Sequence, residues 1–327
     1  MSMLFHLINP VTPSTEVNIE VLKGVIGQEE AKEKLGFFAK SHCDKDPFPT
    51  LLMTGSHGLG KSFLAEKVAM SLNRRFVEIN SNAYQNPSKF IENVLLKRVL
   101  GNEEVTLLLD EAHSLSEGIT NILLTLLNVS GDLENSFTYK GSRFIYNMSK
   151  VNVVFSTTDA YKMFSPLINR CEEIYLYPYS DDEIAQILKL YMDPEMCLQF
   201  SDDNKRDELS MACRGRARNT YRMATRINRY CRMSKSNIFD DDSWDGMKDI
   251  FGIKPLGLDQ QEFNLLRVVS ENGPVSAKTL ALKLMVNQKN IEEEIETRLK
   301  ELDLITNTTR GRILTEKGME YANECFV

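Results

Sequence analysis

The chain has 327 residues, of which 42% are hydrophobic and 26% charged, and its formal net charge is -7. This length indicates a folded protein of more than one domain, and the negative charge argues against a protein that coats nucleic acid through bulk positive charge. No apolar run reaches the length of a membrane span, and the N-terminal segment MSMLFHLINP lacks the basic flank of a secretory signal. We therefore expect a cytoplasmic protein with no membrane partner.

The cysteines are scattered along the chain without a CxxC pair. They are Cys43, Cys171, Cys197, Cys213, Cys231 and Cys325. This pattern predicts reduced thiols, with neither a disulfide framework nor a zinc site.

A glycine-rich loop follows the first strong strand signal. The stretch Glu29 to His42 has helical character, and an apolar run from Leu51 leads into GSHGLGKS, which has the full Gly-x4-Gly-Lys-Ser spacing of a phosphate-binding P-loop. Glycines allow backbone N–H groups to turn toward phosphate oxygens, the lysine brings its charge to the terminal phosphates, and the serine hydroxyl can bind Mg²⁺. The residues expected to hold ATP here are Gly55, Gly58, Leu59, Gly60, Lys61, Ser62 and Phe63.

The segments after this loop alternate between helix and strand patterns. Phe63 to Leu72 has helical apolar spacing, and Arg75 to Asn80 alternates like a half-buried strand. Strands that alternate with helices predict an α/β fold with a parallel sheet and the nucleotide at the carboxyl ends of its strands.

A second buried strand, Val105 to Leu109, ends in two carboxylates. Asp110 is expected to hold Mg²⁺ and Glu111 to act as the general base that polarises the attacking water. An acidic pair after a strand can also be a helix cap, but the upstream P-loop favours the catalytic interpretation. For His113, a surface or capping role and a catalytic role stay open.

The next segments add a hairpin, another strand and an arginine. Phe137 to Tyr146 is expected to form a β-hairpin around a Lys140-Gly141 turn. Val151 to Ser156 reads as a buried strand that ends at Thr157-Thr158, where the hydroxyl of Thr158 could contact the γ-phosphate or the attacking water. Arg170 lies after a short helix, where it could reach the γ-phosphate of a neighbouring subunit as an arginine finger. A last strand, Glu173 to Tyr177, closes a domain of residues 1–179.

Residues 180–250 read as a helical lid domain. Asp181 to Met192 is amphipathic, and Arg218, Arg222, Arg226 and Arg229 share one helical face. A solvated charged face explains the later arginines equally well, whereas Arg218, in the first turn, is expected to bring a second cation to the phosphates. Asp240 to Trp244 reads as an acidic linker.

Residues 251–327 are predicted to form a winged-helix domain. Helices are expected over Gln260 to Glu271, Ser276 to Met285 and Gln288 to Leu302, followed by two short strands around Thr309-Arg310-Gly311. Residues 252–327 carry 10 Lys and Arg against 12 Asp and Glu, so DNA contact should come from the wing, through Arg310 and Arg312, to the phosphate backbone. A winged helix that binds only protein is the alternative.

These motifs resemble the RuvB family of Holliday-junction branch-migration motors, within the AAA+ class. The resemblance covers nearly the whole chain and includes GSHGLGKS, LLLDEAH, SPLINR, GRARN, NGPVSAKTLA and TRGR in order. It implies an ATP-driven DNA motor that assembles as a hexameric ring on duplex or junction DNA, with a possible RuvA-like partner. It also implies roles for individual residues, namely Walker A for Lys61 and Ser62, Walker B for Asp110 and Glu111, sensor 1 for Thr158, arginine finger for Arg170, sensor 2 for Arg218, and adenine contact for Ile26 within Val25 to Gln28.

The chain also departs from that family. Ser56-His57 stands where the family usually has two prolines, the Arg-Pro pair ahead of Ile-Gly-Gln is missing, and the hairpin around Lys140, which in RuvB docks on RuvA, differs in most positions. Ile168 replaces a second arginine, and the resulting Asn-Arg-Cys is similar to the Ser-Arg-Cys of clamp-loader subunits. A clamp-loader-like subunit that loads a partner protein onto DNA, and a DNA-binding regulator, are therefore the alternative functions.

Overall fold

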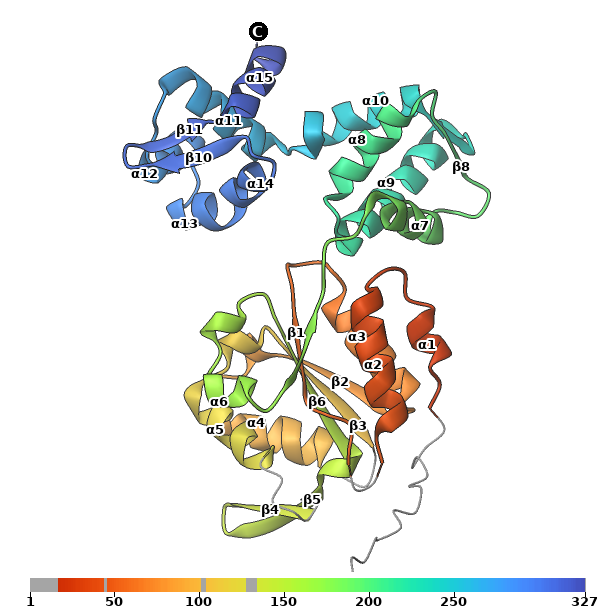
Figure 1. Ribbon diagram of the computed structural model, residues 1–327, viewed down its shortest axis with the longest axis vertical. Coiled ribbons are helices and arrows are strands. Elements are labelled where there is room, and N and C mark those ends of the chain that lie inside the picture. The colour runs from red at the N-terminus through yellow and green to blue at the C-terminus, as the bar shows by residue number, and fades with distance from the viewer. Residues whose placement is uncertain (1–16, 44–45, 101–103, 128–133, 327) are drawn as a thin grey trace, which may run out of the picture. The chain divides into compact units, whose positions relative to one another are not determined.

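The computed structural model describes residues 17–43, 46–100, 104–127 and 134–326 (Figure 1). The N-terminal segment that bears on secretion lies outside these residues. The chain divides into two compact units, one of Met1–Leu190 with Gly215–Tyr221 and one of Tyr191–Arg214 with Arg222–Val327. The predicted boundaries at 179 and 250 are therefore not reproduced by this division and remain predictions.

The first unit contains a five-stranded sheet with the order β2-β3-β6-β1-β7. All neighbouring strands in it are parallel, which confirms the α/β class. The strands are β1 (Leu51–Thr54), β2 (Arg75–Asn80), β3 (Val105–Asp110), β6 (Val151–Thr157) and β7 (Glu172–Tyr175). Because parallel strands end at the same edge, the loops after β1, β3 and β6 meet there.

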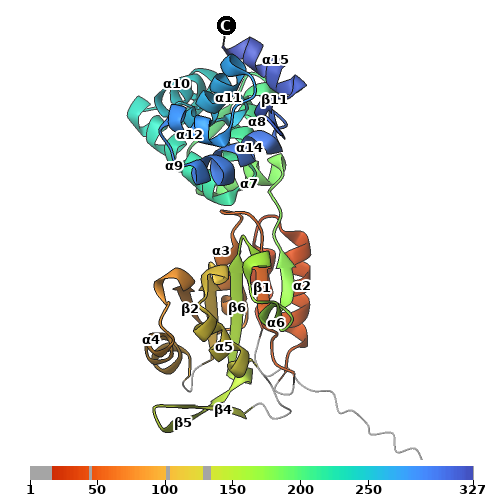
Figure 2. The same ribbon diagram turned by 90° about the vertical axis from the view of Figure 1, so that its left-hand side faces the viewer.

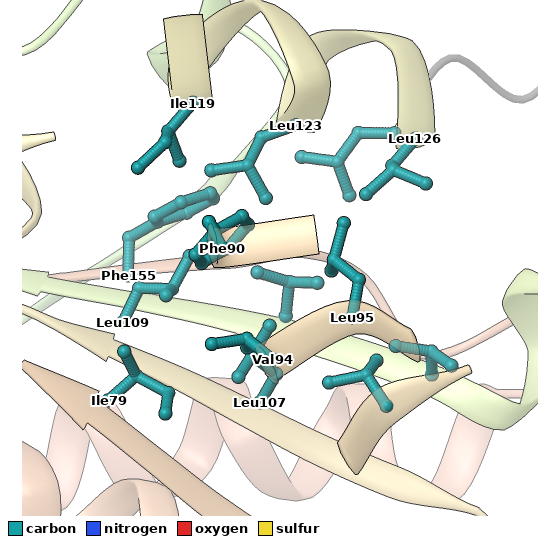
Figure 3. Close-up of a cluster of buried hydrophobic side chains, with 14 of the residues drawn as sticks. Ile79, Phe90, Val94, Leu95, Leu107, Leu109, Ile119, Leu123, Leu126 and Phe155 are labelled. Atoms are coloured by element: carbon teal, nitrogen blue, oxygen red, sulfur yellow. The ribbon is translucent and has the colours of Figure 1, made fainter. Parts of the chain in front are cut away.

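Helices cover both faces of this sheet (Figure 1). One face carries α1 (Glu20–Lys23), α2 (Glu29–Ser41) and α3 (Lys61–Ser71); the other carries α4 (Pro87–Phe90), its π-helical continuation Ile91–Val99, α5 (Glu117–Leu126) and α6 (Ser165–Ile168). Figure 3 shows the core on the face that carries α4, α5 and α6, where Phe90, Leu123 and Phe155 pack together. Each of these side chains is 1% exposed or less. Burial on both faces explains why β3 is almost continuously apolar.

The predicted hairpin is present as β4 (Glu134–Tyr139) and β5 (Ser142–Asn147). Its turn residues Lys140 and Gly141 have φ of 49° and 78°, as a tight hairpin turn with two left-handed residues requires. Figures 1 and 2 show the hairpin at the end of the sheet where β6 starts. The hairpin therefore lies at the end of the sheet opposite to the P-loop and the acidic pair.

The segment after the sheet is largely helical. It contains α7 (Asp181–Tyr191), β8 (Cys197–Gln199), α8 (Asp203–Cys213), α9 (Ala217–Ser234), β9 (Ile238–Asp240) and α10 (Asp241–Phe251). The prediction of an acidic linker at Asp240 to Trp244 is wrong. Asp240 caps α10 by accepting from Ser243 N, acidic residues occupy the first turn, where the helix dipole favours them, and Trp244 is fully buried.

The C-terminal segment has the winged-helix arrangement that the sequence predicts. It consists of α11 (Gln260–Asn272), α12 (Ala277–Leu284), α13 (Gln288–Asn290), the π-helical stretch Ile291–Ile295, α14 (Glu296–Glu301), β10 (Ile305–Thr308), β11 (Gly311–Leu314) and α15 (Glu316–Cys325). A capping box formed by Asp259 and Glu262 starts α11. Leu265, Leu280 and Leu299, one from each of three helices, are fully buried in its core.

Candidate nucleotide site

The P-loop connects β1 to α3, as its sequence requires. Gly55, Gly58 and Gly60 have φ of 142°, 79° and 97°, which L side chains rarely adopt. A Cβ at Gly55 would lie 2.6 Å from Leu176 O, so this position also has no room for a side chain. The Leu59 side chain is buried in the core, which leaves its backbone N–H as the group for a nucleotide contact. The loop therefore presents backbone amides at the N-terminus of an 11-residue helix, a suitable place for phosphate.

Lys61 lies between the loop and the acidic pair. Its Nζ donates to Gly55 O at 2.8 Å and Ser56 O at 3.0 Å, and the residue is only 8% exposed. Burial lowers the pKa of Lys61, while the carboxylates of Glu111 and Asp110 oppose this shift. The lysine charge is thus held beside the two carboxylates that the sequence assigns to Mg²⁺ and to the attacking water.

The acidic pair stands at the end of β3. Asp110 accepts a hydrogen bond from Ser156 Oγ on β6. Glu111 has φ of 52°, in the left-handed region, and its carboxylate lies between two histidines, 3.7 Å from His57 Nδ1 and 3.5 Å from His113 Nδ1. Sequence reasoning missed both histidine contacts. The departure of His57 from the family pattern was the available signal for one of them.

Magnesium needs few protein ligands at such a site. No group of three or more His, Cys, Asp or Glu side chains is placed to hold a metal ion by itself anywhere in the described ranges. Mg²⁺ usually binds through one or two protein oxygens together with nucleotide phosphates and water. Ser62, in the first turn of α3, and Asp110 supply oxygens of this kind, so the residues fit the ion.

The last residue of β6 is Thr157, whose hydroxyl is buried. It is fully buried and its Oγ1 lies 2.8 Å from His113 Nδ1, whereas Thr158 is half-buried just past the strand. The role of Thr158 at the γ-phosphate stays a prediction, and Thr157 is a further hydroxyl at the same edge.

The first turn of α9 brings Arg218 to the P-loop. Arg218 N donates to Gly58 O at 3.1 Å, and a Cβ on Gly58 would lie 3.1 Å from Arg218 Cβ. Its guanidinium is near enough to Lys61 to lower the pKa of the lysine. Tyr179, which sequence reasoning did not single out, fixes the loop through a 3.0 Å bond from its hydroxyl to Leu59 O.

The segment predicted to contact adenine is fixed at its end to the chain just past β7. Gln28 exchanges hydrogen bonds with the backbone of Tyr177, at 2.7 Å to its carbonyl and 3.1 Å from its amide. Ile26 is half-buried beside this anchor, and Phe63 is 44% exposed at the start of α3. Contacts of both residues with nucleotide remain predictions.

Arg170 lies in an exposed turn between α6 and β7. Its Nη1 donates to Pro166 O in α6 at 2.8 Å. Within the described parts of the chain, no carboxylate pairs with this guanidinium. Its role as an arginine finger stays a prediction.

The two wing arginines differ in their surroundings. Arg310 is exposed at the tip between β10 and β11. Arg312 Nε instead donates to Glu296 Oε1 at 2.6 Å, and Glu296 is fully buried. Because the Arg312 guanidinium neutralises a buried carboxylate of its own domain, it is less available to DNA than Arg310. DNA contact by either arginine stays a prediction.

Comparisons with known proteins agree with this architecture. The model of the ATPase family associated with various cellular activities (AAA) matches residues 51–179, and the RuvB C-terminal winged helix domain matches residues 255–323. The Holliday junction branch migration complex subunit RuvB of Ehrlichia ruminantium (strain Gardel) is 28% identical over 93% of this chain and 91% of its own length. The chain is a RuvB-like AAA+ protein. The corresponding subunit of Ehrlichia canis (strain Jake) is 27% identical over 95% of this RuvB-like chain and 94% of its own.

Solved structures agree with the fold of this RuvB-like chain. The Thermotoga maritima RuvB Holliday junction branch migration motor matches it with a TM-score of 0.72 at 22% identity, over 91% of this chain and 95% of that one. A mutant of the same protein reaches a TM-score of 0.74 at 23% identity, over 92% and 97%. The AAA match shows that the N-terminal part of this RuvB-like chain is a nucleotide-binding ATPase domain. No helix in the described residues is long and apolar enough to span a membrane.

Proposed function

We propose that this chain is an ATP-driven DNA motor that promotes branch migration of Holliday junctions. The observation that carries the proposal is the combination of an AAA ATPase domain with a RuvB-type winged helix in one chain. Relatives named as RuvB subunits of a branch migration complex, similar over nearly the whole chain, support it.

The chemistry we propose uses the residues at the carboxyl edge of the sheet. The P-loop amides and Lys61 bind the phosphates of ATP, and Ser62 and Asp110 hold Mg²⁺, which neutralises phosphate charge when bound. Glu111 takes the proton of the attacking water. Thr158 contacts the γ-phosphate or this water, as the strand end after β6 allows.

Two arginines are proposed to stabilise the transition state of ATP hydrolysis. Arg218 approaches the same loop from α9, as its 3.1 Å backbone bond to Gly58 indicates. We propose that Arg170 acts on the γ-phosphate of a neighbouring subunit, since it is exposed and, among the described residues, pairs with no carboxylate. We therefore propose a homo-oligomer, with a hexameric ring as the expected form, in which every site is shared between two protomers.

The proposed DNA contact uses few positive charges and does not depend on the DNA sequence. Arg310 at the wing tip would bind the phosphate backbone of duplex or junction DNA. The relatives are named as subunits of a complex, so a RuvA-like junction-binding protein is the proposed second subunit. The hairpin β4–β5 is the proposed docking site, since Ile145 on it is 67% exposed.

A branch-migration assay tests the proposal. A synthetic Holliday junction with labelled arms is incubated with the chain, Mg²⁺ and ATP, with and without a RuvA-type protein, and duplex products are resolved on a gel. We expect products that require ATP, and none with the Glu111→Gln variant, although this variant keeps nucleotide binding. ATP hydrolysis without any junction processing, together with ATP-dependent loading of a ring-shaped protein onto DNA, would favour the clamp-loader alternative instead.

A further inference from the structure

His113 lies directly behind the proposed general base. It belongs to a short helical turn, Ala112–Ser114, that starts right after Glu111, and its side chain is 20% exposed. Its Nδ1 lies 2.8 Å from Thr157 Oγ1 and 3.5 Å from Glu111 Oε2, while Nε2 lies 3.9 Å from Asp159 Oδ2. The imidazole therefore touches the base on one strand end and the hydroxyl on another.

The surroundings of Thr157 hold this ring in place. Thr157 is fully buried at the end of β6, and its Oγ1 also accepts a hydrogen bond from Asp159 N at 3.0 Å. With a proton on His113 Nδ1, the N–H donates to Thr157 Oγ1, and Glu111 Oε2 is its nearby second acceptor. At 3.5 Å this carboxylate oxygen lies just beyond the usual hydrogen-bonding distance of the ring nitrogen.

The backbone of Glu111 has an uncommon conformation. Its φ of 52° and ψ of 46° are left-handed, which is unfavourable for a residue with a long side chain and is one of the strained conformations that cluster at functional sites. This backbone aims the carboxylate out of the strand direction, but the side chain still has rotatable bonds. His57 Nδ1 approaches the other oxygen, Oε1, at 3.7 Å, but that ring is 64% exposed and has more freedom to move.

We propose that His113 is a positioning residue for ATP hydrolysis: it orients the carboxylate of Glu111 and couples it to the end of β6 through Thr157. The inference rests on the proposed ATPase chemistry and deepens it. In this arrangement, the His113 ring would transmit a movement of the β6 end to the Glu111 carboxylate when the γ-phosphate binds.

A purely structural role for His113 is the competing explanation. The ring also lines a cavity of about 410 Å³ between α5 and the residues around α6, together with Asn121 and Phe164. If His113 only fills space there, its loss should affect stability and leave the chemical step unchanged.

Three substitutions separate the two roles. His113→Leu removes both ring nitrogens, His113→Asn keeps an amide close to the position of Nδ1, and His113→Gln keeps one close to Nε2. We expect His113→Leu and His113→Gln to lower kcat for ATP hydrolysis by about 100-fold, the usual cost of a misplaced catalytic group, with KM and nucleotide affinity unchanged. His113→Asn should recover most of the rate, and Thr157→Val should give an intermediate loss.

The control variants are measured in the same ATP hydrolysis assay, and one of them changes a residue of the same cavity. Asn121→Ala, which changes the exposed side of the cavity, should leave kcat unchanged, and melting curves identify variants that do not fold. In a Glu111→Gln background, His113→Leu should cause no further loss, because both changes remove the same function.

Each result decides a different claim. If the unmodified chain does not hydrolyse ATP, the proposed function fails. If it does, and the folded Leu, Gln and Thr157→Val variants keep its kcat, the positioning role is refuted. The positioning role is also refuted if His113→Asn and His113→Gln retain the same kcat, because the contacts of Nδ1 would then have no special function. If the Leu variant does not fold, the Asn, Gln and Thr157→Val variants still decide.

Discussion

Replacing Arg214 by methionine should destabilise the C-terminal unit by breaking a buried ion pair. Arg214 follows α8 and has a left-handed backbone. Its guanidinium donates to both carboxylate oxygens of Glu262 in the capping box of α11, at 2.9 and 2.7 Å, and to Gly257 O at 3.0 Å. The arginine side chain is 19% exposed and that of Glu262 only 3%. The pair therefore joins a helix of the predicted lid to the start of the winged helix.

The expected loss follows from this burial. Removing one partner of a buried ion pair costs about 3–5 kcal/mol, because the other charge stays buried without compensation. Here the Asp259 amide, at 2.8 Å, still donates to the carboxylate, so we expect a loss of about 3 kcal/mol in the free energy of unfolding, at the low end of that range.

The loss should also depend on pH. Burial raises the pKa of Glu262, and the Arg214 guanidinium opposes this rise. Without Arg214 the folded-state pKa rises further. A raised carboxyl pKa gives stability that is present below the unfolded-state pKa and is lost as pH rises through the folded-state pKa. The destabilisation by Arg214→Met should therefore shrink as the pH is lowered through the raised folded-state pKa of Glu262 toward the ordinary carboxyl pKa.

Urea unfolding followed by tryptophan fluorescence measures this loss. Trp244 is the single tryptophan of the chain and is fully buried in α10, within the same unit. Arg206→Met on α8 is the matched control, because Arg206 and its partner Asp203 are 63% and 89% exposed. Exposed pairs contribute about 0–1 kcal/mol, so this variant should unfold nearly like the unmodified chain. Equal midpoints for the two variants would refute the assigned role of the buried pair.

The remaining predictions concern the wing and the P-loop. Arg310→Ala should weaken DNA binding about equally for all sequences and reduce the salt slope of the affinity by about 1, whereas Arg312→Ala should leave that slope unchanged and lower the melting temperature of the winged helix. Gly311→Ala should also lower this melting temperature, since φ is 134° and an added Cβ would lie 2.5 Å from Val275 O; an unchanged circular-dichroism melt contradicts the close approach. Arg218→Ala should reduce kcat for ATP hydrolysis by about 10-fold or more with a smaller change in nucleotide affinity, as expected for a contact that strengthens in the transition state.

The parts of the fold that could be predicted depend on local signals. β2 begins and ends where its alternation predicts, and the P-loop glycines adopt the positive φ that their spacing requires. The acidic run at Asp240 misled the prediction because carboxylates are common both in linkers and in the first turn of a helix. The burial of Trp244 and the hydrogen bond from Ser243 N to the Asp240 side chain distinguish the two cases in the structure.

The parts that could not be predicted depend on contacts between distant segments. Arg312 is expected to face DNA from its place beside the wing tip, but its partner Glu296 is 16 residues away. His113 and Thr157 meet across two strands and are 44 residues apart. No spacing rule connects such residues, since the register between β3 and β6 brings them together.

The central claim is that ATP is bound by one protomer and hydrolysed with an arginine from the next. Mixing Arg170→Ala subunits with Lys61→Ala subunits tests it directly, because each variant lacks a different half of the shared site. Random assembly of an equal mixture should restore about a quarter of the sites, since each active site needs an intact P-loop from one variant and an intact Arg170 from its neighbour. Steady-state phosphate release should therefore rise well above that of either variant alone. Release that stays at the level of the separate variants at every mixing ratio would contradict the claim.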